Sequence, residues 1–251
     1  MSSLAILLIA VGLGDVCRRL TRPRWVSPTV AVAVIVVFVV LGGLWHAGDV
    51  PLLVVAIAAG VAWPLLCERA ERTGKHQALP LAVFGGAGAA LILLSGWASD
   101  VDGLVARWSD WVDLADADVS PTRLLMIVGV MLTQVATTNQ LVRLILGSVG
   151  AVRPVGQPQP SDRLKGGRLL GPMERLLIVG LGLGGQLTMA TAVVAAKSII
   201  RFPELNAQRS EAGRAPSPGI GIDDVTEYFL VGSFASWILA FGSLALIGAT
   251  P

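Results

Sequence analysis

The chain has 251 residues, of which 54% are hydrophobic and only 14% are charged, and its mean hydropathy is +0.72. Soluble domains carry about 25% charged residues, so this composition indicates a membrane protein. The formal net charge of +2 excludes the strong basic field of a nucleic-acid-binding domain, and two cysteines are too few for a disulfide scaffold. We therefore expect the lipid bilayer as a partner, and no nucleic acid.

Seven apolar segments are candidates for membrane crossings, because a spanning helix needs about 20 predominantly apolar residues. They predict an all-α fold, a polytopic transmembrane helical bundle of about seven spans: Ser3–Val16, Pro28–Trp45, Leu52–Cys67, Leu79–Ala98, Thr122–Val149, Met173–Ile200 and Val225–Gly248. The first segment lacks the basic leader and cleavage pattern of a signal peptide. We interpret it as a retained anchor with its N-terminus outside.

Basic residues in short loops mark the cytoplasmic side, because they resist translocation. Residues 18–24 carry four arginines and no acidic residue, so we expect this loop inside. Alternation from there also places the basic loop around Arg72 inside, and the aspartate-rich stretch 99–120 outside. This pattern predicts a multi-pass membrane protein whose arginine-rich loops lie on the cytoplasmic side.

The chain divides on this interpretation into three regions. Residues 1–150 form a five-span N-terminal region, residues 151–171 form a Pro-rich cytoplasmic linker, and residues 172–251 form a two-span C-terminal region.

The sixth segment, Met173–Ile200, is long and has four glycines near its middle. We expect it to cross the membrane once as a tilted helix, although this leaves Arg209 and Arg214 of the following loop outside. The alternative is a re-entrant pair of half-helices. Irregular backbone at membrane depth is tolerated only where it is buried in protein or lines water, so a hairpin here would be functional.

Tryptophans recur at helical spacing in the stretch 99–119 and just before it. Trp97, Leu104, Trp108 and Trp111 fall on one face, which predicts an amphipathic helix lying on the outer membrane surface with its tryptophans toward lipid. The alternative is that this face packs on the protein's own helices. Six aspartates in the stretch favour the alternative, because they would repel anionic headgroups.

Polar residues within the fifth and sixth segments predict a binding site. By depth, Gln134 and Gln186 both fall near the midplane, and we hypothesise that they meet in a polar cleft that opens inward. The alternative is that these residues form helix–helix hydrogen bonds, with cations that extend to the boundary. The candidate substrate- or partner-binding residues are Gln134, Asn139, Gln140, Arg143, Glu174, Arg175, Gln186, Lys197, Arg201 and Glu227.

A straight sixth helix would carry Lys197 and Arg201 to the outer interface. Glu227, at the start of the seventh segment, is then expected to pair with either of them.

Metal and catalytic sites are not predicted. Cys17, Cys67, His46 and His76 have no pair at ligand spacing, so we expect no metal, no cofactor and no catalytic residue. Both cysteines are expected as thiols near a reducing cytoplasm.

Small residues four positions apart predict faces where helices approach closely. The four pairs are Gly180 with Gly184, Gly85 with Ala89, Ala56 with Gly60, and Gly232 with Ser236.

Three motifs in the C-terminal third carry a resemblance to a known family. Residues 167–177 read GRLLGPMERLL, residues 195–202 read AAKSIIRF and residues 226–233 read TEYFLVGS. In this order and spacing they resemble an uncharacterised bacterial polytopic membrane family, the domain of unknown function 3307. The resemblance implies a bacterial cytoplasmic (inner) membrane as the location. The resemblance implies that eight residues belong to the motifs of the family, without assigning them a chemistry: Glu174, Arg175, Lys197, Ser198, Arg201, Phe202, Glu227 and Tyr228.

The N-terminal signature of that family, of the type His-x-x-Gly-Asp, is matched here only by Gly14 and Asp15, with no histidine before them. A metal or hydrolytic role resting on that signature is therefore not expected.

Three classes of function fit these observations. The first choice is a non-enzymatic membrane scaffold or accessory subunit, with a membrane protein partner or a second copy of the chain. The alternative is a transporter or lipid-handling protein that uses the polar cleft. A membrane enzyme is the least supported class, because the spans lack a convergent acid, base or metal site.

Overall fold

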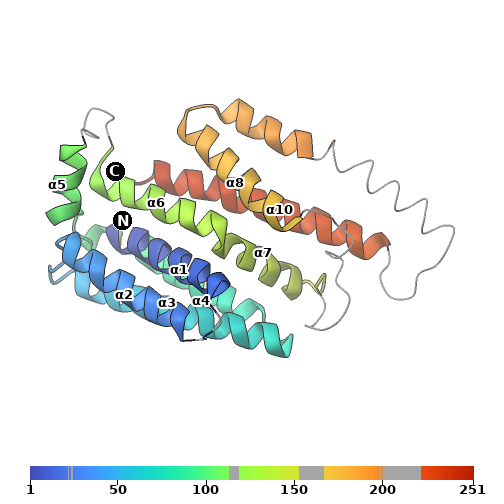
Figure 1. Cartoon of the computed structure of the whole chain (residues 1–251), viewed down its shortest axis with the longest axis horizontal. Helices are drawn as coiled ribbons and strands as arrows, with labels where there is room; N and C mark the ends of the chain where they lie inside the picture. Colours follow the sequence, from blue (N-terminus) through green and yellow to red (C-terminus); the bar gives the residue numbers. More distant parts are fainter. Residues whose placement is uncertain (22, 24, 113–118, 153–166, 198, 200–221) are drawn as a thin grey trace. The chain divides into compact units, whose positions relative to one another are not determined.

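The computed structural model describes residues 1–21, 23, 25–112, 119–152, 167–197, 199 and 222–251, and every regular element within them is helical (Figure 1). The all-α expectation is therefore confirmed for this part of the chain. The elements in order are α1 (Ser2–Leu20), α2 (Val26–Leu41), α3 (Asp49–Thr73), α4 (Ala78–Leu93), the 3-10 helix η1 (Ser95–Trp97), α5 (Gly103–Trp111), α6 (Pro121–Val135), α7 (Thr137–Ser148), α8 (Gly167–Leu183), a helix at Leu187–Lys197, and α10 (Ile222–Gly248).

Two of the described helices are long and apolar enough to cross a membrane. They are Asp49–Thr73 of α3 and Thr226–Gly248 of α10, which contain 18-residue windows with mean hydropathies of 2.3 and 2.0. α6 and α7 qualify together as one broken span, bent by 54°. α2, α4 and Leu187–Lys197 are apolar but shorter. The described residues thus contain two or three candidate spans, which is compatible with a membrane protein.

The chain forms two compact units. Unit 1 consists of residues 1–69, 79–137 and 245–251, and unit 2 of residues 70–78 and 138–244. The division between them at residues 137 and 138 falls at the start of α7.

α1 is the central helix of unit 1, buried along most of its length and packed against α2 and α6. Two glycines permit the close approach of α1 and α6. A Cβ atom on Gly129 would lie 2.9 Å from the Ala5 carbonyl oxygen, and one on Gly12 would lie 2.8 Å from the Leu132 Cβ. Glycine at these positions thus sets the distance between the two backbones, as small residues do in membrane helix pairs.

Both termini lie at the same end of unit 1 (Figure 1). The Ser2 hydroxyl donates a hydrogen bond to the Ser99 carbonyl at 2.6 Å. The Ser120 hydroxyl donates to the Pro251 carbonyl at 2.5 Å. Since the Val101 amide also bonds the Thr122 hydroxyl at 3.2 Å, these segments form one connected end of the unit.

Unit 2 contains a helical hairpin, in which α8 and the helix Leu187–Lys197 fold back on each other (Figure 1). α8 ends at Leu183, and Gly185 turns the chain with a φ of +74°, which glycine adopts without steric cost. The side chains of Glu174 and Lys197 meet at 2.6 Å. In a straight helix their Cα atoms would lie about 35 Å apart. The expected single tilted crossing is therefore wrong, and the hairpin alternative describes this segment.

A helix is present in the stretch 99–119, as α5, and it is shorter than that stretch. Its position on a membrane surface stays a prediction. Residues 113–118 lie outside the described residues. Trp97, Trp108 and Trp111 are 62%, 51% and 82% exposed. The alternative that this face packs on the protein's own helices is therefore wrong for the described tryptophans.

Candidate functional site

Glu174 lies at the centre of a buried polar cluster in unit 2. The Lys197 ammonium contacts its Oε2 at 2.6 Å, and the Trp237 indole N–H donates to its Oε1 at 2.8 Å. The Lys197 ammonium also lies over the Trp237 ring, 5.6 Å from the centroid, in the position of a cation–π contact. Each carboxylate oxygen thus has a donor, and the cluster ties both arms of the hairpin to α10.

Arg175, the next residue on α8, is only 2% exposed and connects α8 to two further helices. Its Nη1 donates to the Ser236 hydroxyl of α10 at 3.0 Å, and its Nη2 donates to the Asn139 Oδ1 of α7 at 2.6 Å. A Cβ atom on Gly171 would lie 3.3 Å from Nη1, so the absence of a side chain there leaves room for the guanidinium. We call Asn139, Glu174, Arg175, Lys197, Ser236 and Trp237 the hairpin cluster.

A second polar group in unit 2 lies around Glu71, at the C-terminal end of α3. The Gln140 side-chain amide donates to the Glu71 Oε1 at 2.8 Å, and the Arg143 Nη1 lies 4.0 Å from the same oxygen. The side chains of Arg143 and Glu71 are 48% and 27% exposed, so this ion pair contributes little free energy.

The structure brings together four of the ten predicted site residues in the hairpin cluster: Asn139, Glu174, Arg175 and Lys197. Gln140 and Arg143 instead meet at Glu71.

The remaining predicted residues have other outcomes. Gln134 is buried in unit 1 and Gln186 is exposed at the hairpin turn of unit 2, so their meeting stays a prediction. The expected pairing of Lys197 with Glu227 is wrong, because the hairpin turns Lys197 back to Glu174 and leaves Glu227 exposed. Arg201 lies outside the described residues.

Asp15 forms a buried polar contact in unit 1 that the sequence analysis missed. Its residue exposure is 2%, and its Oδ2 accepts a hydrogen bond from the Trp63 indole N–H at 3.0 Å. The Arg18 Nε lies 3.9 Å from the other carboxylate oxygen. The Gly14-Asp15 pair was visible in the sequence, but nothing near it indicated Trp63, which lies 48 positions away.

Arg19 binds the break between α6 and α7. Its guanidinium donates to the carbonyl oxygens of Val135 at 3.3 Å and Ala136 at 2.9 Å. A helix break removes the normal partners of such carbonyls, and a side-chain donor replaces them. Asp15 and Arg19 are four positions apart on α1, so one face of α1 makes both contacts.

His46, Asp49 and Ser99 also lie together, in unit 1. The Ser99 hydroxyl lies 2.9 Å from the His46 Nδ1, and the Asp49 Oδ2 lies 3.6 Å from that same nitrogen. A catalytic relay needs the serine and the aspartate on opposite ring nitrogens. The Asp49 carboxylate instead accepts hydrogen bonds from the backbone amides of Ser99 and His46, at 2.8 and 3.2 Å. Asp49 therefore joins the two loops that carry these residues.

Within the part of the chain that the structure describes, no three His, Cys, Asp or Glu side chains lie close enough to hold a metal ion. Cys17 and Cys67 are free thiols. No family model, no curated protein and no solved structure matches this chain. The resemblance to the domain of unknown function 3307 therefore stays a prediction.

Proposed function

We propose that this chain is a multi-pass protein of a bacterial cytoplasmic membrane that acts as a scaffold or accessory subunit. The topology that fits best has six crossings and one re-entrant hairpin in place of seven crossings. Ser2, Ser99, Ser120 and Pro251 belong to one end of unit 1, which supports an even number of crossings between Ser2 and Pro251.

The distribution of basic residues supports the same topology. A hairpin that enters and leaves on the cytoplasmic side keeps the loop with Arg209 and Arg214 inside, in agreement with the positive-inside rule. With the N-terminus outside, the loop of residues 18–24 and the linker 151–171 also remain inside.

The scaffold role rests on one observation, which is that the polar groups of the hairpin cluster bond to one another. Glu174 bonds Lys197 and Trp237, while Arg175 bonds Asn139 and Ser236. Such bonds hold helices together and need no ligand. The outer surface of the hairpin is apolar instead, with these large side chains exposed: Leu170, Met173, Leu177, Leu187 and Met189.

The family resemblance fits this interpretation. Glu174 belongs to the first motif and Lys197 to the second, and their ion pair gives a physical reason for the spacing of the two motifs. We propose that members of the domain of unknown function 3307 family form the same hairpin.

The scaffold proposal predicts a specific neighbour on the apolar surface of the hairpin. A photo-crosslinking residue at Leu177, which is 50% exposed, should give one discrete protein adduct in native membranes. The same residue at Val179, which is 0% exposed, is the matched control and should give none. Adducts with lipid alone at Leu177 would contradict the proposal, and an adduct of twice the chain mass would identify a second copy as the partner.

A transporter or lipid-handling protein is the second candidate, and broken helices favour it. The 54° break between α6 and α7 and the hairpin turn at Gly185 are features of segments that line substrate paths. An Asn139→Cys variant separates the two functions. Labelling by a membrane-impermeant thiol reagent from the cytoplasmic side would favour a solvent path, whereas protection favours the scaffold.

A further inference from the structure

α5 has three distinct sides. At 100° per residue, Leu104, Trp108 and Trp111 share one face. Ser109 lies about 130° from that face in one direction and is 3% exposed, so this side packs on the protein. Asp110 lies about 130° away in the other direction and is exposed, so this side meets water. A helix with a protein side, a polar exposed side and an apolar exposed side fits a boundary between lipid and water.

The backbone around Gly103 fixes α5 against the end of α2. A Cβ atom on Gly103 would lie 2.7 Å from the Leu41 carbonyl oxygen, and the glycine has a φ of +67°. The amide of Asp102 donates to the Gly42 carbonyl at 3.0 Å. The first residue of α5 therefore lies against the last residue of α2, and backbone contacts set the orientation of α5.

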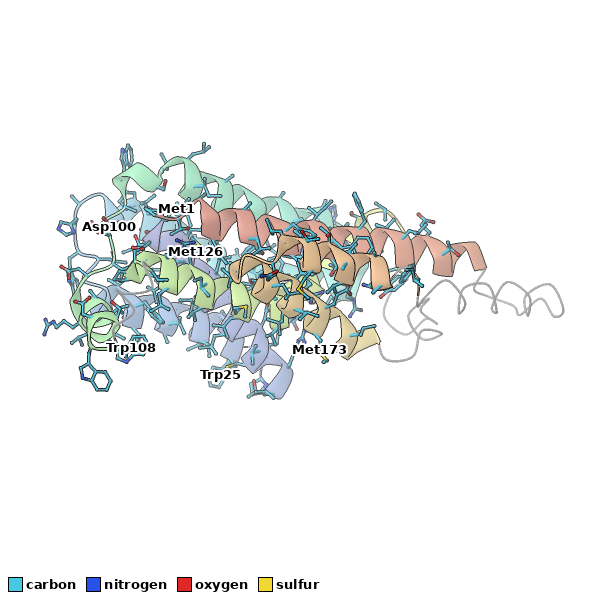
Figure 2. All side chains as sticks on the ribbon, turned by 90° about the horizontal axis from the view of Figure 1, so that it is seen from above. Met1, Trp25, Asp100, Trp108, Met126 and Met173 are labelled. Carbon is cyan, nitrogen blue, oxygen red and sulfur yellow. The ribbon has the colours of Figure 1, made fainter. Side chains whose placement is uncertain are left out.

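More exposed tryptophans lie at the same end of unit 1. Trp45 and Trp97 are 64% and 62% exposed, and the contact of His46 with Ser99 joins the loops that carry them. Figure 2 shows Met1, Asp100 and Trp108 toward this end. Tryptophan is enriched where a bilayer meets water, because its ring is apolar and its N–H is polar.

The opposite boundary is marked by Trp25, which immediately precedes α2 and is 66% exposed. The 16 residues of α2 extend about 24 Å, somewhat less than a hydrocarbon core of about 30 Å. Between the two boundaries α2 exposes Val36, Val37 and Val40. Exposed apolar side chains therefore lie both on the side of α2 and on the face of α5.

We propose that α5 lies in the interface of the outer leaflet, with Leu104, Trp108 and Trp111 inserted among the lipid headgroups and acyl chains. The occupant of this face is a lipid surface. The inference rests on the proposed membrane topology and adds an anchor at the outer boundary, which fixes the depth of unit 1 in the bilayer.

Spin labels on the full chain in phosphatidylcholine vesicles test this inference. Trp108→Cys reports on the lipid side and Asp110→Cys on the water side, in a Cys17→Ser, Cys67→Ala background. Both positions are exposed, so neither label disturbs the core. We expect the ratio of oxygen to nickel-chelate collision rates to be several-fold higher at position 108 than at position 110.

A third label at Val37→Cys separates failure of this inference from failure of the proposed topology. If position 37 reports lipid while position 108 reports water, α5 is not interfacial and the membrane protein stands. If position 108 is shielded from both reagents, protein and not lipid covers the face, and the inference is also overturned. If position 37 reports water, the membrane topology itself fails.

Discussion

Glu174 and Lys197 stand 23 positions apart in the chain, and their side chains meet at 2.6 Å. This contact defines the hairpin, because no single continuous helix can make it. Since Trp237 of α10 bonds the same carboxylate, the ion pair also holds the hairpin against its neighbour.

Loss of the cation should destabilise unit 2. Lys197→Met leaves Glu174 buried without its charged partner, and breaking a buried pair typically costs about 3 to 5 kcal/mol. We expect a lower melting temperature in detergent. The double variant Lys197→Met, Glu174→Gln removes both charges and should recover most of the loss. Equal instability of the single and double variants would contradict a role for the pair.

The side of the loop after the hairpin should distinguish six crossings from seven. Cysteines introduced at Ser161 and Ser210 should both be protected from an impermeant reagent in intact cells, and both should react after the membrane is opened. A cysteine at exposed Trp45, expected outside, is the control that must react in intact cells. Reaction at position 210 in intact cells would restore the seventh crossing.

Close packing of α1 and α6 should depend on Gly129. The added methyl group of Gly129→Ala meets backbone at 2.9 Å, so we expect a loss of about 1 to 3 kcal/mol in the free energy of unfolding. Gly86→Ala is the matched control on α4, where a Cβ atom would meet nothing within 4 Å. Equal unfolding free energies for the two variants would show that α1 and α6 have room to separate.

The Asp15–Trp63 hydrogen bond should contribute to the stability of unit 1. Trp63→Phe leaves a buried carboxylate without its indole donor, which typically costs about 1 to 3 kcal/mol. Trp25→Phe, on the exposed surface, should leave stability unchanged. In a double-mutant cycle with Asp15→Asn, additive losses would mean that Trp63 acts through packing against Phe84 and not through its N–H.

Residue composition and spacing predicted the helical content and the positions of most helices, because apolar runs and basic loops are local signals. They could not decide whether the segment around Gly185 continues or reverses. Glycines occur both in close-packed helices and at turns, and the deciding contact joins Glu174 to a residue 23 positions away. Depth along an assumed straight helix also placed Lys197 at the wrong end, beside Glu227.

The small-residue faces show the same limit. A Cβ atom on Gly60 would lie 3.5 Å from the Ala31 Cβ, and one on Gly232 would lie 3.4 Å from the Leu146 Cδ1, so these two positions have neighbours at ordinary contact distance. A Cβ atom on Gly85 or Gly180, however, would meet nothing within 4 Å. The close approach of α1 to α6 instead uses Gly12, and the residues four positions from it, Leu8 and Val16, are not small. Spacing identifies a smooth helix face, but only the partner helix decides whether that face is used.

The ion pair of the hairpin also constrains how the protein is made. In the proposed topology the hairpin lies at membrane depth, where a lone charged side chain costs several kcal/mol, so neither arm is expected to enter the hydrocarbon stably before the other arrives. Because the ribosome completes α8 before it synthesises Lys197, the proposed topology predicts that α8 enters the membrane only after the second arm has emerged. On this topology we expect the two arms to insert together, at a time set by the synthesis of Lys197.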